Sequence, residues 1–187
     1  MKTYAVLAAL VLAGAAPCAA QQAMKSGPKQ LSPEQAQAQK GIMLMRDSVL
    51  AAQSALRQLQ RDYEKAAPRT LEGWAGQAAE RCAAAERTSQ VARALVAGPS
   101  FIPAEMARGQ KDMVAAIDRS RTTLGSCQST FKPLAAAGKG EEVRAYGNYR
   151  AKPLLKQLEK FDQAVHNAIH ALDLDVREVL KAGKAPA

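Results

Sequence analysis

Aromatic residues are scarce in this chain of 187 residues, which contains one Trp, three Phe and four Tyr. Residue types that favour strands are few, whereas Ala, Gln, Leu, Lys and Arg, which favour helices, are abundant. This composition argues against a sandwich or barrel built from strands. It predicts an all-α protein of about one domain.

Motifs that carry familiar catalytic chemistry are also missing. The chain has no Gly-rich phosphate loop, no nucleophile elbow, no HExxH sequence and no CxxCH sequence for covalent haem. Paired carboxylates such as Glu141 and Glu142 fall at an expected helix start, where negative charge is favoured in any case. We therefore expect a protein that is not an enzyme and that holds no cofactor.

The first twenty residues have the layout of a secretory signal peptide. Lys2 supplies a positive start, residues 5–16 form an uncharged run dominated by Ala, Val and Leu, and small residues stand before Gln21. The apolar run is about half the length that a membrane-spanning helix needs. The pattern predicts cleavage after Ala20, with Ala23 as the near alternative, and a periplasmic or secreted protein with no integral membrane span after cleavage.

Cys18 raises the alternative of a lipoprotein, in which the chain is cut before a cysteine that is then acylated. Ala15 stands where such a site prefers Leu, and Pro17 stands where it prefers a small residue. Both departures favour ordinary cleavage over acylation.

Positive charge exceeds negative charge, with 26 Lys and Arg against 17 Asp and Glu. A basic protein can meet anionic lipid, lipopolysaccharide, peptidoglycan or nucleic acid through electrostatics alone. Here the charges are spread along the chain and are not gathered in one block. This spread is typical of an ordinary solvated surface, and we do not expect nucleic acid as a partner.

The sequence predicts a helix N-terminus at Ser32. Ser32 can cap the helix, Pro33 suits its first position, and the Gln35 side chain can bond back to the capping residue. The pattern predicts a first helix from about Pro33 to Ala66, ended by Pro68. Its apolar positions recur at alternating steps of four and three, which indicates a face packed on other helices. These positions are Ala38, Ile42, Met45, Val49, Ala52, Leu56, Leu59, Tyr63 and Ala66.

Two further helices are predicted, one capped by Thr70 and stopped at Gly98, the other opened by Pro103 and kinked near its end by Pro133. The core face expected of the second consists of Leu71, Ala75, Ala78, Cys82, Ala85, Ser89, Ala92 and Val96. The core face expected of the third consists of Met106, Gln110, Met113, Ile117, Ser120, Leu124, Cys127, Phe131 and Leu134.

The fourth predicted helix begins near Glu141 and is disturbed at Pro153. Its expected core face continues with Leu154, Leu158, Phe161, Val165, Ala168, Leu172, Val176 and Val179. Long amphipathic helices with short connections favour an elongated, antiparallel, up-down four-helix bundle. We assign residues 32–182 to this bundle, 21–31 to a flexible polar leader and 183–187 to a frayed tail.

Two cysteines remain after the expected cleavage, Cys82 and Cys127, and an oxidising compartment favours a disulfide between them. Both fall on the core face of their helices. The bridge requires the third helix to begin well beyond the end of the second, because a turn near Ser100 would leave the two cysteines about 13 Å out of level at ~1.5 Å per residue. The alternative is two separate buried thiols.

The two histidines of the chain, His166 and His170, lie one helical turn apart, with Asp162 and Asp173 on the same face. Such a set could hold Zn, Cu or Ni. A haem held between His170 and Met43 or Met45 is a second alternative, since antiparallel first and fourth helices bring those positions level. The simpler interpretation is that the histidines are surface residues and that Met45 belongs to the core.

Lys152, Lys156 and Lys160, at steps of four, are the best candidates for contact with an anionic partner. Trp74, Tyr146 and Tyr149 are possible contact aromatics, although lone aromatics on bundle helices more often pack into the core. The sequence favours a non-enzymatic, exported interaction module that binds another protein or an envelope component. A metal- or haem-binding bundle is the alternative.

Export can be tested by mass spectrometry of the protein recovered from its native compartment. We expect a mature chain that begins at Gln21, because the charged start, the apolar run and the small residues all precede that position. An N-terminus at Met1, or a lipid on Cys18, would show the interpretation to be wrong.

Overall fold

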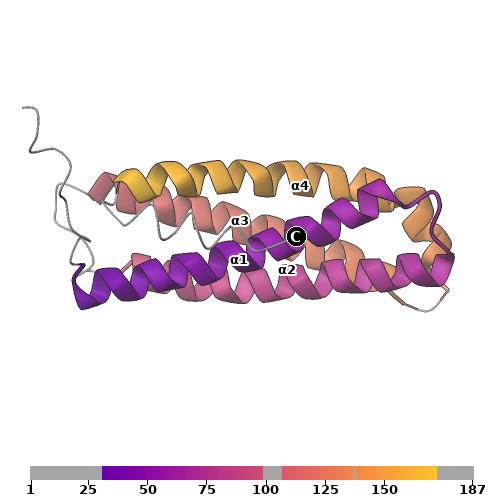
Figure 1. Cartoon of the computed structure of the whole chain (residues 1–187), viewed down its shortest axis with the longest axis horizontal. Coiled ribbons are helices and arrows are strands. Elements are labelled where there is room, and N and C mark those ends of the chain that lie inside the picture. The colour runs from indigo at the N-terminus through magenta and orange to yellow at the C-terminus, as the bar shows by residue number, and fades with distance from the viewer. Residues whose placement is uncertain (1–30, 99–106, 137, 172–187) are drawn as a thin grey trace, which may run out of the picture. The chain divides into compact units, whose positions relative to one another are not determined.

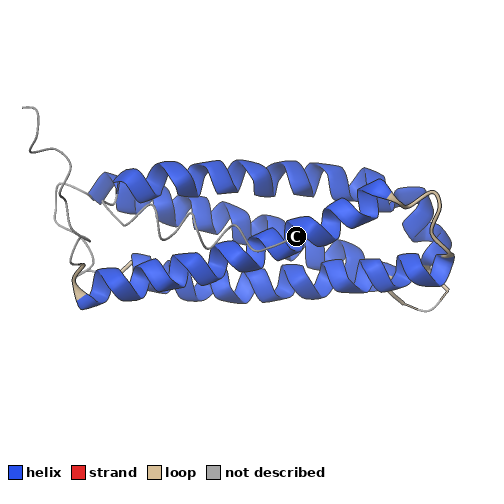
Figure 2. Cartoon of the chain, viewed as in Figure 1, coloured by secondary structure: helices blue, strands red, loops and turns tan. Residues whose placement is uncertain are grey.

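The computed structural model describes residues 31–98, 107–136 and 138–171, with side chains as far as residue 168. Four helices occupy almost all of this part: α1 (Pro33–Arg61), α2 (Pro68–Val96), α3 (Ala107–Leu134) and α4 (Gly140–Ala171). No strand occurs in the described ranges (Figure 2). The all-α prediction is confirmed.

The four helices lie side by side as a bundle (Figure 1). Each packs on the next along the chain, and α1 also packs on α4, which closes the ring. Arg46 pairs with Asp162 and the later Arg57 pairs with the earlier Glu159, so α1 and α4 are antiparallel. The pairs Glu86–Arg121 and Arg93–Asp118 show the same for α2 and α3. Across the ring α2 touches α4, whereas α1 and α3 hardly meet. The predicted up-down four-helix bundle is therefore confirmed, and it is narrower along the α2–α4 diagonal.

The start of α1 forms as the sequence predicts. The Gln35 backbone N–H donates to the Ser32 hydroxyl at 3.2 Å, and the Ser32 backbone N–H donates to the Gln35 side chain at 3.0 Å. Hydrogen bonds from the backbone and from Ser32 lower the pKa of Glu34, which suits a negative charge at a helix N-terminus. These bonds satisfy N–H groups that have no partner inside the helix.

The boundary between α1 and α2 differs from the prediction. α1 ends at Arg61 and not near Ala66. The chain turns after Asp62, whose carbonyl accepts hydrogen bonds from the backbone N–H groups of Lys65 and Ala66. Pro68 is the first residue of α2 and does not act as the end of α1, and the cap position is Ala67, not Thr70. Proline fits the first turn of a helix because its missing N–H would be unpaired there anyway.

The core is built from the predicted faces of α1, α2 and α3, with Tyr63 and Ala66 in the following turn packed against it. All eight positions predicted for α2 are buried. The largest fully buried side chains come from all four helices: Ile42, Met45, Leu56, Leu59, Leu71, Met113, Ile117, Leu124, Phe131 and Leu158. In the third predicted face Gln110 is only half-buried, and Met106 lies outside the described residues.

α4 runs through Pro153 without a break, contrary to the predicted disturbance. Its buried positions Val143, Gly147 and Ala151 continue in phase to Leu155, so that Leu155 and not Leu154 enters the core. Pro153 lies on the exposed face, where the carbonyl that loses its helical donor can bond to water. Leu172, Val176 and Val179, the last residues of the predicted face, are outside the described residues.

Cys82 and Cys127 form the predicted disulfide between α2 and α3, with their Cα atoms 6.1 Å apart. The register that this bridge requires is present, because the Gln110 side chain, in the first described turn of α3, donates to the carbonyls of Val96 and Gly98 at 2.7 and 3.2 Å. α3 therefore begins beyond the end of α2. On the chain-entropy argument a bridge over this sequence separation stabilises the fold by about 4 kcal/mol.

At one end of the bundle the starts of α2 and α4 lie against each other. The carboxylate of Glu72 accepts hydrogen bonds from the backbone N–H groups of Gly138 and Gly140, both at 3.0 Å. Gly138 has a φ of +82°, which favours glycine. A Cβ on Gly140 would lie 2.3 Å from the Pro68 carbonyl oxygen. This close approach needs glycine, and the acidic side chain of α2 caps α4.

Two glycine substitutions should have opposite effects on stability. Gly140→Ala forces a methyl group onto the backbone of Pro68 and should destabilise the fold by about 1–3 kcal/mol. Gly125→Ala, in α3 where an added Cβ meets nothing within 4 Å, should stabilise it by about 0.5–1 kcal/mol. Urea unfolding followed by circular dichroism measures both, and equal midpoints for the two variants would contradict the close contact.

Candidate functional site

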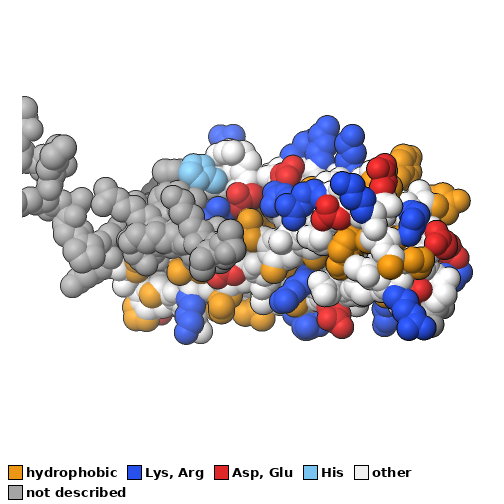
Figure 3. Space-filling model, turned by 45° about the vertical axis from the view of Figure 1, so that its right-hand side comes forward, with side chains coloured by type: hydrophobic (Ala, Val, Ile, Leu, Met, Phe, Trp, Pro, Cys, Tyr) orange, Lys and Arg blue, Asp and Glu red, His pale blue; other side chains and the backbone are white. Residues whose placement is uncertain are grey.

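Lys152, Lys156 and Lys160 form an exposed row along α4. Successive members are four residues apart, which is about 6 Å of rise along the helix axis. None of the ion pairs within the described residues involves any of the three. Lys and Arg side chains project from the edge of the bundle where α4 lies (Figure 3). The structure thus places the predicted lysines on one accessible face.

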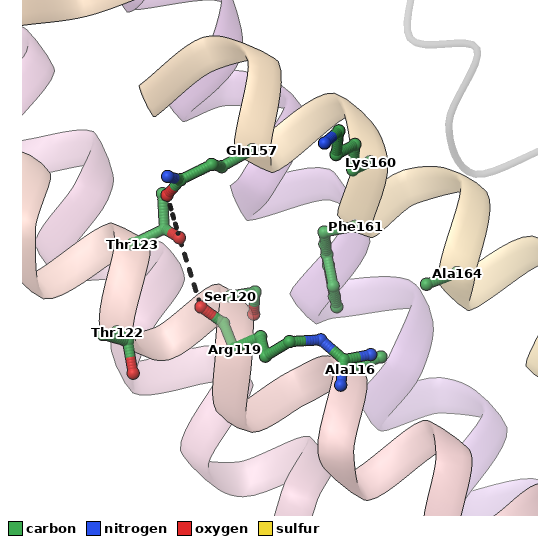
Figure 4. Close-up of a pocket in the computed structure, with 9 residues that line it drawn as sticks. All are labelled: Ala116, Arg119, Ser120, Thr122, Thr123, Gln157, Lys160, Phe161 and Ala164. Atoms are coloured by element: carbon green, nitrogen blue, oxygen red, sulfur yellow. Dashed lines mark hydrogen bonds between the residues drawn. The ribbon is translucent and has the colours of Figure 1, made fainter. Parts of the chain in front are cut away.

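A groove between α3 and α4 lies beside this row. The hollow of this groove at Phe161, called the main hollow below, has a volume of about 450 Å³. Phe161 points from α4 toward α3, and Arg119 extends from α3 along the groove (Figure 4). A second hollow of about 270 Å³ shares Arg119 and Ala164 with the first. This site is not evident from the sequence, because Arg119 lies outside the apolar face of α3 and only the packing of the two helices brings it opposite Lys160.

Polar side chains close one part of the main hollow. The Thr123 hydroxyl donates to the Gln157 side-chain oxygen at 2.9 Å and also lies 3.2 Å from the Arg119 carbonyl (Figure 4). The Ser120 hydroxyl donates to the Ile117 carbonyl at 2.9 Å. The Gln157 amide nitrogen takes part in no hydrogen bond with the described residues, so it can donate to an oxygen atom in the groove.

Two tyrosines near the lysine row are exposed, contrary to the expectation that lone aromatics pack into the core. Tyr149 is 82% exposed and Tyr146 is 53% exposed. The guanidinium of Arg150 lies 5.9 Å from the centre of the Tyr146 ring. Trp74 does pack partly buried against the core. An exposed tyrosine beside lysines offers an apolar surface with a hydroxyl group to a partner.

The predicted metal ligands meet a competing interaction. Arg46 of α1 donates through Nε to the Asp162 carboxylate at 2.8 Å, and the Arg46 side chain is only 12% exposed. Asp162 therefore joins α1 to α4, and metal binding through it would have to break this pair. His166 is half-buried one turn further along α4. The side chain of His170, and Asp173, lie outside the described residues.

In the part of the chain that the structure describes, no three His, Cys, Asp or Glu side chains form a group that could hold a metal ion. Met45 is fully buried in the core, and Met43 packs partly buried against it. A haem between either methionine and His170 stays a prediction, because the His170 side chain is not among those described. No described helix is both long enough and apolar enough to cross a membrane.

Comparison with protein-family models, with curated proteins and with solved structures finds no match to this chain.

Metal binding can be tested directly by titration of the purified protein with Zn²⁺ and Cu²⁺. A specific site made by the two histidines would bind one ion per chain and would be lost in the His166→Ala, His170→Ala double variant. We expect binding no tighter than in that variant, because Asp162 is held by Arg46. Stoichiometric binding that the double variant abolishes would establish the metal site instead.

Proposed function

We propose that this chain is a non-enzymatic interaction module of the periplasm, or a secreted one, that binds a protein or an envelope component through the exposed face of α4. The lysine row, which forms no ion pair with the described residues, is the observation that carries this proposal. Export rests on the signal sequence, and binding rests on the surface chemistry of the described residues.

The ion pairs between helices are made by arginines and not by the lysine row. Arg57 pairs with Glu159, Arg93 with Asp118 and Arg121 with Glu86, and each pair joins neighbouring helices. The hydrogen bond to Asp118 raises the pKa of Arg93. The ion pairs between helices of the described bundle are thus supplied by arginines, and the lysines of α4 take no part in them.

An anionic partner suits this face for two reasons. A row of like charges repels itself, and a negative surface relieves that repulsion while gaining roughly 1 kcal/mol per lysine held near it. Tyr149 beside the row can contact an apolar or sugar-like part of the same partner. Because these charges are exposed, the attraction should weaken as salt concentration rises.

The test replaces the lysine row while keeping the fold. In a variant with Lys152, Lys156 and Lys160 changed to Gln, sedimentation with phosphatidylglycerol vesicles should weaken by on the order of 100-fold, since three lysines contribute together. The matched control changes Lys40, Lys65 and Lys132 to Gln, which removes the same charge from exposed positions elsewhere. Phosphatidylcholine vesicles report on binding that does not need negative charge.

Equal binding by the two triple variants would show that net charge alone attracts the vesicles, and it would overturn the proposal for this face. Crosslinking in cells extends the test to protein partners. A photoreactive residue in place of Tyr149 should capture a partner that is lost from the lysine-row variant and retained by the control.

A further inference from the structure

We propose that the α3–α4 groove binds a single-chain anionic amphiphile, with its acidic group between Arg119 and Lys160 and its hydrocarbon chain over Phe161 and Ala164. This inference deepens the proposed function, because it names a ligand class for the surface beside the lysine row. It uses side chains from α3 that the lysine row does not include.

The floor of the groove is apolar. Phe161 and Ala116 are almost fully buried, and Ala164 is half-buried between the two hollows. The main hollow, at about 450 Å³, is within the range of roughly 300–1,000 Å³ that ligand sites occupy. A hydrocarbon chain is favoured here because it covers carbon atoms of the floor.

Two cations lie on the rim of the main hollow, whereas the exposed carboxylate of Asp112 lines the second hollow. Arg119 and Lys160 are exposed on opposite helices, and no carboxylate of the described residues pairs with either. A carboxylate or sulfate can accept two parallel hydrogen bonds from a guanidinium group, while the lysine adds a point charge. Gln157 can donate a further hydrogen bond from its amide nitrogen. These donors line the same hollow as the apolar side chains of Phe161 and Ala164, which is the pattern of an amphiphile site.

The groove is elongated along the helices. The second hollow continues from Arg119 and Ala164 to Asn167 and Ala168, one turn further along α4. Ala115, Ala164 and Ala168 contribute methyl groups to this second hollow, which Asp112, Arg119 and Asn167 also line. A small inorganic anion would use the rim but not the apolar path, and this difference separates the two kinds of ligand.

Calorimetric titration with hexanoate, octanoate and decanoate below their micelle concentrations tests the proposal. The Kd should fall by about two- to fourfold for each added methylene, since burial of one methylene favours binding by up to ~0.8 kcal/mol. Arg119→Gln should weaken decanoate binding about tenfold, because it removes the guanidinium from the rim. Arg87→Gln, which removes the same charge from an exposed position of α2, should leave it unchanged.

Ala164→Trp provides the second test, because it fills the path between the two hollows. It should abolish the dependence on chain length while vesicle binding through the lysine row persists. If this variant does not fold, Arg119→Gln still decides the matter. Absence of any chain-length dependence in the unaltered protein, or equal weakening by Arg119→Gln and Arg87→Gln, would overturn the inference. In either case vesicle binding that needs the lysine row would leave the proposed function standing.

Discussion

The bundle depends on the close approach that the small side chains of α2 allow. Ala75, Ala78, Ala85 and Ala92 are fully buried, so the neighbouring helices can reach the backbone of α2. This closeness brings α4 across the diagonal and places Gly140 on the carbonyl of Pro68. Bulky residues in α2 would separate these elements, and both the helix cap from Glu72 and the narrow α2–α4 diagonal would be lost. Because aromatic residues are few, the core is filled mainly by aliphatic side chains, and the helices must lie close together to leave no cavity.

The charged residues divide into two groups with different roles. Arginines joined to carboxylates of neighbouring helices fix the register, and Arg46 with Asp162 is the least exposed of these pairs. Arg119 of α3 and the row of Lys152, Lys156 and Lys160 on α4 form no ion pair among the described residues. Exposed lysines contribute little to stability, so their arrangement is free to serve contacts outside the fold. Some of the excess positive charge of the chain therefore stabilises the bundle, and the rest lies on its surface, where a partner can contact it.

Periodicity predicted the bundle well because a helix face is a local property of the sequence. Eight of the nine buried positions of α2 follow from steps of three and four alone, and Ala79 is the ninth. Proline was harder to interpret: Pro68 could end one helix or begin the next, and Pro153 could break α4 or lie harmlessly on its exposed face. The lysine row was visible because its members share one helix. The groove was not, because Arg119 and Lys160 are brought opposite each other only by the packing of α3 against α4.

The disulfide has a consequence for how the bundle opens. Cys82 and Cys127 close α2 and α3 into one covalent loop, whereas α1 and α4 are held to them by packing and polar contacts alone. Proteins open locally in cooperative units, and the unit that opens at lowest cost is the one with the fewest constraints. We therefore expect amide protons of α4 to exchange with solvent through openings that leave α2 and α3 paired. Of the two helices that line the α3–α4 groove, α3 is held by the disulfide and α4 is not.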